Sequence, residues 1–276
     1  MNVQLAPSTL TPVLKWHGGK QPQARPFVEL MPPHTQYVEL FFGGGAVLLA
    51  KNPDGVSEVA NDLNGDLMGF WRVLQDPATF ERFHRIVEAV PFSEVEWNEA
   101  RDALQRRTEA DPVRRAVWFF VFCRQSLAGR MDAFAPLSRN RTRRGMNEQA
   151  SAWLSAVAGL PAVHARLRRV AILCRLALDV IRQQDTQDTL FYCDPPYLHE
   201  TRKSRKAYAF EMTEQDHRDL LEALRGCKGK VMLSGYPSAL YDQALADWTR
   251  HAFDLPNNAA GGPTKARQTE VVWCNF

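Results

Sequence analysis

The sequence has no long hydrophobic run. Its longest uninterrupted apolar stretch, residues 116–123, is eight residues long, whereas about 20 are needed to cross a bilayer. The five cysteines lie far apart and show neither Cys-x-x-Cys nor Cys/His ligand spacing, which argues against disulfides and metal ligation. Residues 1–14 lack a basic start followed by an apolar stretch and a cleavage site. We therefore expect a cytoplasmic protein with no membrane span and no metal.

What the sequence does have is an uneven distribution of charge. The net charge of the 276 residues is +3, yet residues 101–175 hold 15 arginines, no lysine and 5 acidic residues, a net charge of +10. The rest of the chain has 19 basic and 26 acidic residues, a net charge of −7. Arginine suits bidentate contacts with phosphate and guanine. A polyanionic partner is one interpretation of this segment, and a set of solvated helix faces is the other.

The first part of the chain carries a strand, a glycine turn and a helix. Residues 37–40 form a predicted strand that runs into glycines and then into a predicted helix over 46–50. A turn follows, and residues 57–60 form the next predicted strand, so the three elements make one β-α-β unit. From about residue 65 to 167 the apolar spacing becomes helical, interrupted by a polar loop over 124–149.

Strand patterns return in the last hundred residues. They cover residues 170–173, 189–193, 230–234 and 270–276. A helix between them opens on a capping-box pattern at residues 213–216. Alternating strands and helices predict an α/β fold with a mainly parallel sheet covered on both faces.

The segment Asp194-Pro195-Pro196-Tyr197 carries the most specific chemistry. It directly follows a predicted strand, and the carboxyl ends of parallel strands are where open α/β sheets bind ligands. The prolines rigidify the turn and remove two backbone donors, which leaves the Asp194 carboxylate, the Pro195 carbonyl and the Tyr197 ring. These groups suit a planar ring that bears an NH2, such as a nucleobase. The alternative is an ordinary Asp-Pro turn.

Two further segments are informative only when they are considered together with other motifs. Phe41, Gly43 and Gly45 form a glycine turn after the first predicted strand, and Asp62 ends the next one, a spacing that favours an adenosine-type ligand. Residues 15–20, Lys-Trp-His-Gly-Gly-Lys, precede the first strand. Taken alone, they favour a loop anchored by a buried tryptophan over a binding site.

In this order and spacing, residues 15–20, the glycine turn, Asp62 and the Asp-Pro-Pro-Tyr segment resemble the Dam-like (D12 class, alpha group) N6-adenine-specific DNA methyltransferases. The resemblance covers residues 13–62 and 170–276. It implies a class I Rossmann-like fold for S-adenosylmethionine-dependent methyltransferases, with a mainly parallel seven-stranded sheet and a helical target-recognition insertion. The implied domains are a catalytic domain over 1–64 and 168–276 and a helical target-recognition domain over 65–167.

The resemblance also implies roles for single residues. The catalytic residues would be Asp194, Pro195, Pro196 and Tyr197, with Ser234 and Tyr236 beside the target base. S-adenosylmethionine would be bound by Trp16, Lys20, Phe41, Gly43, Gly45, Asp62, Asp179 and Asp194. The DNA-binding residues would be Arg124, Arg130, Arg139, Arg141, Arg143, Arg144, Arg202, Lys203, Arg205 and Lys206.

The implied reaction is methyl transfer to the N6 amine of an adenine flipped out of double-stranded DNA. The Gly-x-Phe-Asn segment of the Dam subgroup is missing, so a GATC target does not follow. Other readings are methylation of cytosine N4 or of RNA adenine, a nicotinamide-dependent oxidoreductase, and a DNA-binding protein without activity. We expect a monomer or weak dimer, with a cognate restriction endonuclease as a further potential partner.

Overall fold

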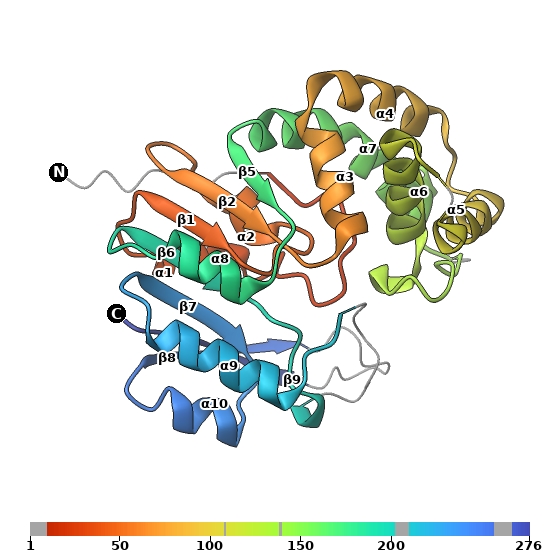
Figure 1. The fold of residues 1–276 in the computed structure, drawn as a ribbon. Coiled ribbons are helices and arrows are strands. Elements are labelled where there is room, and N and C mark those ends of the chain that lie inside the picture. Colours follow the sequence, from red (N-terminus) through yellow and green to blue (C-terminus); the bar gives the residue numbers. More distant parts are fainter. Residues whose placement is uncertain (1–9, 108, 138–139, 202–209, 257–266) are drawn as a thin grey trace. The chain divides into compact units, whose positions relative to one another are not determined.

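A computed structural model describes residues 10–107, 109–137, 140–201, 210–256 and 267–276 (Figure 1). The helices are α1 Ala24–Leu30, α2 Ala46–Ala50, α3 Gly65–Gln75, α4 Pro77–Ala89, α5 Glu94–Arg106, α6 Pro112–Gln125, α7 Glu148–Leu167, α8 Ala177–Gln184, α9 Glu214–Arg225 and α10 Ala239–Ala244, with short 3-10 turns η1 Leu127–Gly129 and η2 His199–Thr201. The strands are β1 Gln36–Glu39, β2 Ser57–Asn61, β3 Thr142–Arg143, β4 Met146–Asn147, β5 Val170–Leu173, β6 Thr189–Cys193, β7 Lys230–Gly235, β8 Thr249–Pro256 and β9 Arg267–Cys274.

The main sheet has seven strands in the order β5-β2-β1-β6-β7-β9-β8. Strand β1 pairs in parallel with β2 and β6, and β6 pairs in parallel with β7. At the other side, β9 runs antiparallel to β7 and β8 runs antiparallel to β9. The predicted fold class, a mainly parallel seven-stranded sheet with flanking helices, is thereby confirmed.

The chain divides into two compact units. The helical unit comprises Met1–Met31, Gly43–Asp54 and Asn64–Cys174, and the sheet unit comprises Pro32–Phe42, Gly55–Leu63 and Arg175–Phe276. The helices α3 to α7 belong to the first unit, and strands β1, β2 and β6 to β9 belong to the second. The predicted insertion, residues 65–167, therefore falls within the helical unit together with Gly43 and Gly45, whereas Phe41 belongs to the sheet unit.

Aromatic packing holds the helical unit together. The Phe70 ring of α3 stacks on the Phe120 ring of α6, with centroids 5.7 Å apart and planes 5° apart, and Phe83 of α4 meets both rings edge-on. All three side chains are fully buried. Helices α3 to α7 each begin at a side chain that accepts a hydrogen bond from the first backbone N–H groups of the helix. For example, the Asn64 side chain accepts hydrogen bonds from the backbone of Asp66 and Leu67 at the start of α3.

The sheet unit is built around a strand with no exposed residue. Every residue of β6 is buried, as expected for a central parallel strand covered on both faces. Helices α8 and α9 lie side by side along the sheet in Figure 1. Helix α9 begins with the predicted capping box, in which Thr213 and Asp216 satisfy each other's backbone donors. Because β1, β6 and β7 are parallel, their carboxyl ends share one edge of the sheet.

Several boundaries differ from the sequence-based expectations. Helix α6 continues to Gln125, so the predicted loop begins there rather than at 124, and it contains the short antiparallel hairpin β3–β4. The last strand covers Arg267–Cys274 instead of 270–276, and β8 was not predicted at all. Within the described ranges, no helix combines the length and the apolar character that crossing a membrane would require.

Candidate active site

Asp194 lies at the carboxyl end of β6, where two hydroxyl groups lie close to its carboxylate. The Ser234 hydroxyl, from β7, donates a hydrogen bond of 2.8 Å to Asp194 Oδ1. The Tyr197 hydroxyl lies 3.2 Å from the same oxygen. Pro195 is buried, whereas Asp194 and Pro196 are half-buried. The carboxylate is thus fixed in direction while part of its surface faces outward.

A buried tyrosine extends this network into the core. The Tyr192 hydroxyl is 3.2 Å from the Ser234 hydroxyl, which also contacts the Cys193 carbonyl at 3.2 Å. Burial, and then the negative charge of Asp194, raise the pKa of Tyr192 well above its ordinary value. The phenol therefore stays protonated around neutral pH. It can donate to Ser234, which leaves the serine proton for Asp194.

The Tyr197 side chain is fixed by an acid from the other end of the sequence. Its hydroxyl donates a hydrogen bond of 2.5 Å to Glu270 Oε1, on β9. Glu270 is 5% exposed and Tyr197 is 7% exposed. The Tyr197 ring also meets the Tyr236 ring edge-to-face, with centroids 4.5 Å apart. The structure therefore brings Asp194, Pro195, Tyr197, Ser234 and Tyr236 together, as the sequence predicted, and adds Glu270, which was not predicted.

A second cluster lies where β1 and β2 end. Asn61, 1% exposed, donates from its side-chain amide to the Leu40 carbonyl at 3.1 Å and to the Arg175 carbonyl at 3.0 Å. Its backbone carbonyl accepts from the Phe42 amide at 2.8 Å. This fixes the loops that carry Phe41 and Asp62, both half-buried. Sequence reasoning assigned no role to Asn61. The available signal was a polar side chain at the end of an apolar strand, directly before Asp62, because a polar group buried there has to form hydrogen bonds.

Asp179, the other predicted cofactor residue of the sheet unit, lies in the first turn of α8. Its carboxylate is 2.9 Å from Arg182, three residues later on the same helix; the Arg182 side chain is largely exposed and that of Asp179 is half-buried. An acidic residue in a first helical turn is stabilised by the helix dipole, so this position has a local structural role of its own.

In the helical unit, the glycine turn packs against a tryptophan. Gly43 and Gly45 have φ values of +49° and +69°, in the left-handed region that favours glycine. A β-carbon at Gly43 would lie 2.6 Å from Trp16 Nε1, and one at Gly44 would lie 2.9 Å from Trp16 Cβ. The Trp71 indole donates to the Gly43 carbonyl at 3.1 Å. Residues 15–20 and the turn are therefore in close contact, and only glycine fits there.

Lys20 has a buried charge. Its side chain is 6% exposed and its ammonium donates to the Gly18 carbonyl at 3.0 Å. A buried ammonium is costly unless it is hydrogen-bonded and paired with negative charge. Lys20 thus places a positive charge among the residues that the family resemblance assigns to the cofactor.

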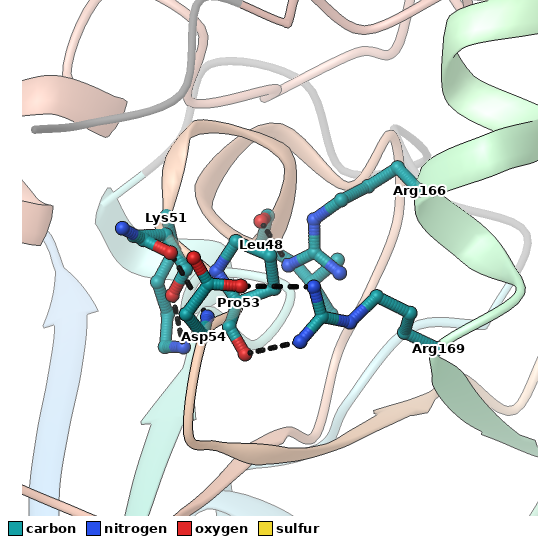
Figure 2. A network of polar contacts seen from close by, with 7 residues as sticks. Leu48, Lys51, Pro53, Asp54, Arg166 and Arg169 are labelled. Atoms are coloured by element: carbon teal, nitrogen blue, oxygen red, sulfur yellow. Dashed lines mark hydrogen bonds and ion pairs between the residues drawn. The ribbon is translucent and has the colours of Figure 1, made fainter. Parts of the chain in front are cut away.

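Two arginines near the end of α7 hold the segment that follows the glycine turn (Figure 2). Arg166, 6% exposed, donates to the Leu48 carbonyl of α2 at 3.1 Å. Arg169 lies 3.0 Å from the Asp54 carboxylate and 3.2 Å from the Pro53 carbonyl. A cation at the carboxyl end of a helix complements its dipole. We call this pair of arginines the α7 clamp.

The predicted DNA-binding residues differ in their surroundings. Arg130, Arg141, Arg143 and Arg144 are exposed, the last two on the β3–β4 hairpin and Arg141 directly before it. Arg124 is half-buried and donates to the Ala152 carbonyl of α7 at 2.9 Å. Arg139, Arg202, Lys203, Arg205 and Lys206 lie outside the described residues.

The hairpin has a sharp turn. Arg144 and Gly145 both have positive φ, 55° and 73°, the conformation of a two-residue turn that matches the twist of paired strands. The turn projects Arg143 and Arg144 from an element only two residues long on each side. Arg141, just before it, has an ion pair of 3.7 Å with Glu148.

Among the described side chains, His, Cys, Asp and Glu form no group of three or more that could hold a metal ion. Burial raises the pKa of the Cys123 and Cys274 thiols to about 12. These cysteines are therefore protonated and unreactive near neutral pH.

Comparison with known proteins gives consistent matches. The family model described as D12 class N6 adenine-specific DNA methyltransferase matches residues 16–257. The chain is 25% identical over 238 residues to the DNA N-6-adenine-methyltransferase of Escherichia phage P1, an alignment that covers 82% of this chain and 30% of that protein. It is 24% identical over 255 residues to the Type II methyltransferase M.MjaIII of Methanocaldococcus jannaschii, covering 81% of this chain and 83% of that protein. The chain thus spans under a third of the phage relative's length.

Proposed function

Because this chain belongs to the D12 class N6 adenine-specific DNA methyltransferase family, we propose that it transfers a methyl group from S-adenosylmethionine to the N6 amine of a flipped-out adenine in double-stranded DNA. The observation that carries this proposal is the Asp194 carboxylate at the end of β6, held by the Ser234 hydroxyl. The carboxylate is thus oriented as a hydrogen-bond acceptor before a substrate arrives. Such preorganisation of polar groups is the main source of catalytic power in many active sites.

The residues fit the proposed methyl donor. S-adenosylmethionine would supply an electrophilic methyl group on a positively charged sulfur. Gly43 and Gly45 are buried in conformations that favour glycine, and the absence of side chains there would let a ligand approach the backbone of the turn closely. The Lys20 ammonium suits the carboxylate of the methionine end, and the Asp62 carboxylate suits ribose hydroxyls. Trp16 and Phe41 would contribute apolar contacts, and Asp179 would lie near the cofactor adenine.

The target amine would be oriented by two acceptors. The Asp194 carboxylate and the Pro195 carbonyl each accept one N–H of the amine, which draws the nitrogen lone pair out of conjugation with the ring. The same two oxygens stabilise the positive charge that develops on nitrogen as the new C–N bond forms. Pro196 keeps the turn rigid. As the C–N bond forms, the bond between the methyl carbon and sulfur would break, and the nitrogen would then release one proton to water, which leaves neutral N6-methyladenine and S-adenosylhomocysteine.

Tyr197 would stack on the flipped base. Because its side chain is only 7% exposed, the base has to displace side chains that cover the ring, and Tyr236 is in direct contact with it. Entry of the base would therefore move Tyr236, while the Tyr197 hydroxyl stays hydrogen-bonded to Glu270.

DNA would be held by basic residues, with the helical segment 65–167 as the target-recognition domain and residues 1–64 and 168–276 as the catalytic domain. Exposed Arg130, Arg143 and Arg144 are suited to phosphate contacts. Arg139, Arg202, Lys203, Arg205 and Lys206, outside the described residues, and Arg124 and Arg141 complete the proposed set. The protein would act in the cytoplasm as a monomer or weak dimer, with a restriction endonuclease as a candidate partner.

The test is methyl transfer from radiolabelled S-adenosylmethionine to unmethylated genomic DNA, with nucleoside analysis of the product by mass spectrometry. We expect N6-methyladenine. Asp194→Ala should lower the rate by at least about a thousandfold and leave binding of duplex DNA within about twofold, because the acceptor is lost and the basic residues are unchanged.

Three outcomes would count against the proposal. N4-methylcytosine in the product would change the target base, and label in RNA alone would change the substrate. Full activity in Asp194→Ala would remove that residue from the catalytic role. Asp254→Asn, which removes an exposed acid from β8, is the matched control for loss of one negative charge and should methylate at the wild-type rate.

A further inference from the structure

Glu270 is a buried acid that the Asp-Pro-Pro-Tyr motif does not contain. It lies on β9, where it pairs with Phe253 of β8. The next residue of β9, Val271, pairs with Gly235 of β7. Its side chain is 5% exposed. A buried carboxylate is costly unless hydrogen bonds compensate it, and the Tyr197 hydroxyl provides one at 2.5 Å. The acid is therefore placed where it can act on the tyrosine of the proposed site.

The Tyr197 hydroxyl has one proton and lies near two carboxylates. The distance to Glu270 Oε1 is 2.5 Å and the distance to Asp194 Oδ1 is 3.2 Å. Since one proton can make one strong hydrogen bond, the shorter contact receives it. Asp194 Oδ1 already accepts the Ser234 hydroxyl at 2.8 Å. Glu270 thus draws the tyrosine proton away from Asp194.

We propose that Glu270 is a positioning residue for methyl transfer. It anchors the Tyr197 ring through the hydroxyl, and it prevents that hydroxyl from becoming a second full donor to Asp194. The acceptor strength of the Asp194 carboxylate is then kept for the amine of the substrate. This inference rests on the proposed function, because the amine is the group that Asp194 would orient.

The test uses the full-length protein and two isosteric substitutions. Glu270→Gln keeps the shape of the side chain but weakens the acceptor, so the tyrosine proton turns to Asp194. We expect kcat to fall about tenfold, with KM for S-adenosylmethionine and for DNA within about twofold. A merely structural role would lower the amount of folded enzyme or change KM, so thermal unfolding is measured in parallel. Asp254→Asn, one strand away on β8, is the control for the lost charge.

The second substitution, Tyr197→Phe, removes the hydroxyl and keeps the ring. If Glu270 acts through that hydroxyl, the double variant is no slower than the slower single variant, because the shared interaction can be lost only once. If instead the loss of kcat in the double variant equals the product of the losses in the two single variants, Glu270 acts independently of the Tyr197 hydroxyl, and the inference is overturned.

Three further outcomes are decisive. If Glu270→Gln does not fold, Tyr197→Phe alone still decides, since a folded variant with the wild-type kcat means that the anchored hydroxyl does no work. If the wild-type protein methylates DNA but Glu270→Gln keeps its kcat, only the positioning role fails. If the wild-type protein methylates no DNA, the proposed function fails, and the positioning role fails with it.

Discussion

The carboxyl edge of the sheet unit and the β3–β4 hairpin of the helical unit represent opposite ways of presenting charge. At the edge, the acids Asp194 and Glu270 are half-buried or buried, and each accepts hydrogen bonds from hydroxyl groups of the same cluster. On the hairpin, the Arg143 and Arg144 side chains are exposed, the first in a strand of two residues and the second in the turn. One region is fixed before any substrate arrives, and the other can adapt to its partner.

This difference separates orientation from attraction. A fixed acceptor lowers the barrier of a reaction because its dipoles need not reorganise, whereas exposed cations act through a field that salt screens. We therefore expect changes at the edge to alter kcat and changes on the hairpin to alter affinity for DNA and its dependence on salt.

Among substitutions that leave Asp194 itself in place, the largest effect is expected from Ser234→Ala at the edge. The substitution removes the 2.8 Å donor to Asp194 and so weakens the constraint on the direction of the carboxylate. Hydrogen bonds to charged groups contribute roughly 1.5–3 kcal/mol, so kcat should fall about 30-fold in a steady-state assay with saturating DNA. The affinity for DNA should stay within about twofold.

Ser234→Thr, which retains the hydroxyl, should recover most of the rate. If Ser234→Ala raised KM for DNA and left kcat unchanged, the edge would be a binding surface, and the comparison with the hairpin would fail.

An intermediate effect is expected from the paired substitution Arg143→Gln and Arg144→Gln. Each phosphate contact contributes about 0.9 to the slope of log affinity against log salt, so the slope should fall by about 2 and affinity by about tenfold at low salt. Fluorescence anisotropy with a labelled duplex over a range of salt concentrations measures both quantities.

The matched control is Arg182→Gln with Arg218→Gln, two exposed arginines of the sheet unit that pair with acids on their own helices. This control should bind DNA like the wild type. Equal losses in the two double variants would mean that overall charge, and not the hairpin, attracts DNA.

The smallest effect near neutral pH concerns stability. Burial raises the pKa of Cys123 and Cys274 from an ordinary value of 9.0 to about 12, and that of Tyr192 well above 10.0. Above pH 9 the unfolded chain therefore binds fewer protons than the folded one. Stability is fully present below pH 9 and is lost as pH rises toward 12. Urea unfolding at about pH 7.5, 9 and 10.5 measures the free energy of unfolding at each pH. Equal free energies at the three pH values would contradict the prediction.

The sequence predicted the elements that local patterns determine. The continuous apolar run of β6, the glycine turn and the Thr213–Asp216 capping box all occur where expected. Strand β8 could not be predicted because its polar and exposed residues provide no apolar run, and its pairing with β9 is a tertiary property. The Tyr197–Glu270 bond joins residues 73 positions apart, so no local pattern indicates it.

The charge of residues 101–175 was only partly informative. Arg166 and Arg169 contribute to the count of 15 arginines, yet they hold backbone and acidic groups within the helical unit. Arg115 likewise forms an ion pair with Asp66 at 2.6 Å. A count of arginines cannot distinguish such side chains from those of the exposed hairpin, because the distinction depends on which carbonyls and carboxylates the fold brings near.

The α7 clamp also sets an order of events during protein synthesis. Arg166 and Arg169 follow their partners Leu48 and Asp54 by 118 and 115 positions. The ribosome adds residues from the amino terminus onward, at about 5–20 per second, so α2 and the turn after it leave the exit tunnel several seconds before the arginines exist. A nascent chain that ends before residue 166 has neither contact. The contacts of Leu48 and Asp54 with the clamp therefore form only after residues 166 and 169 have been synthesised.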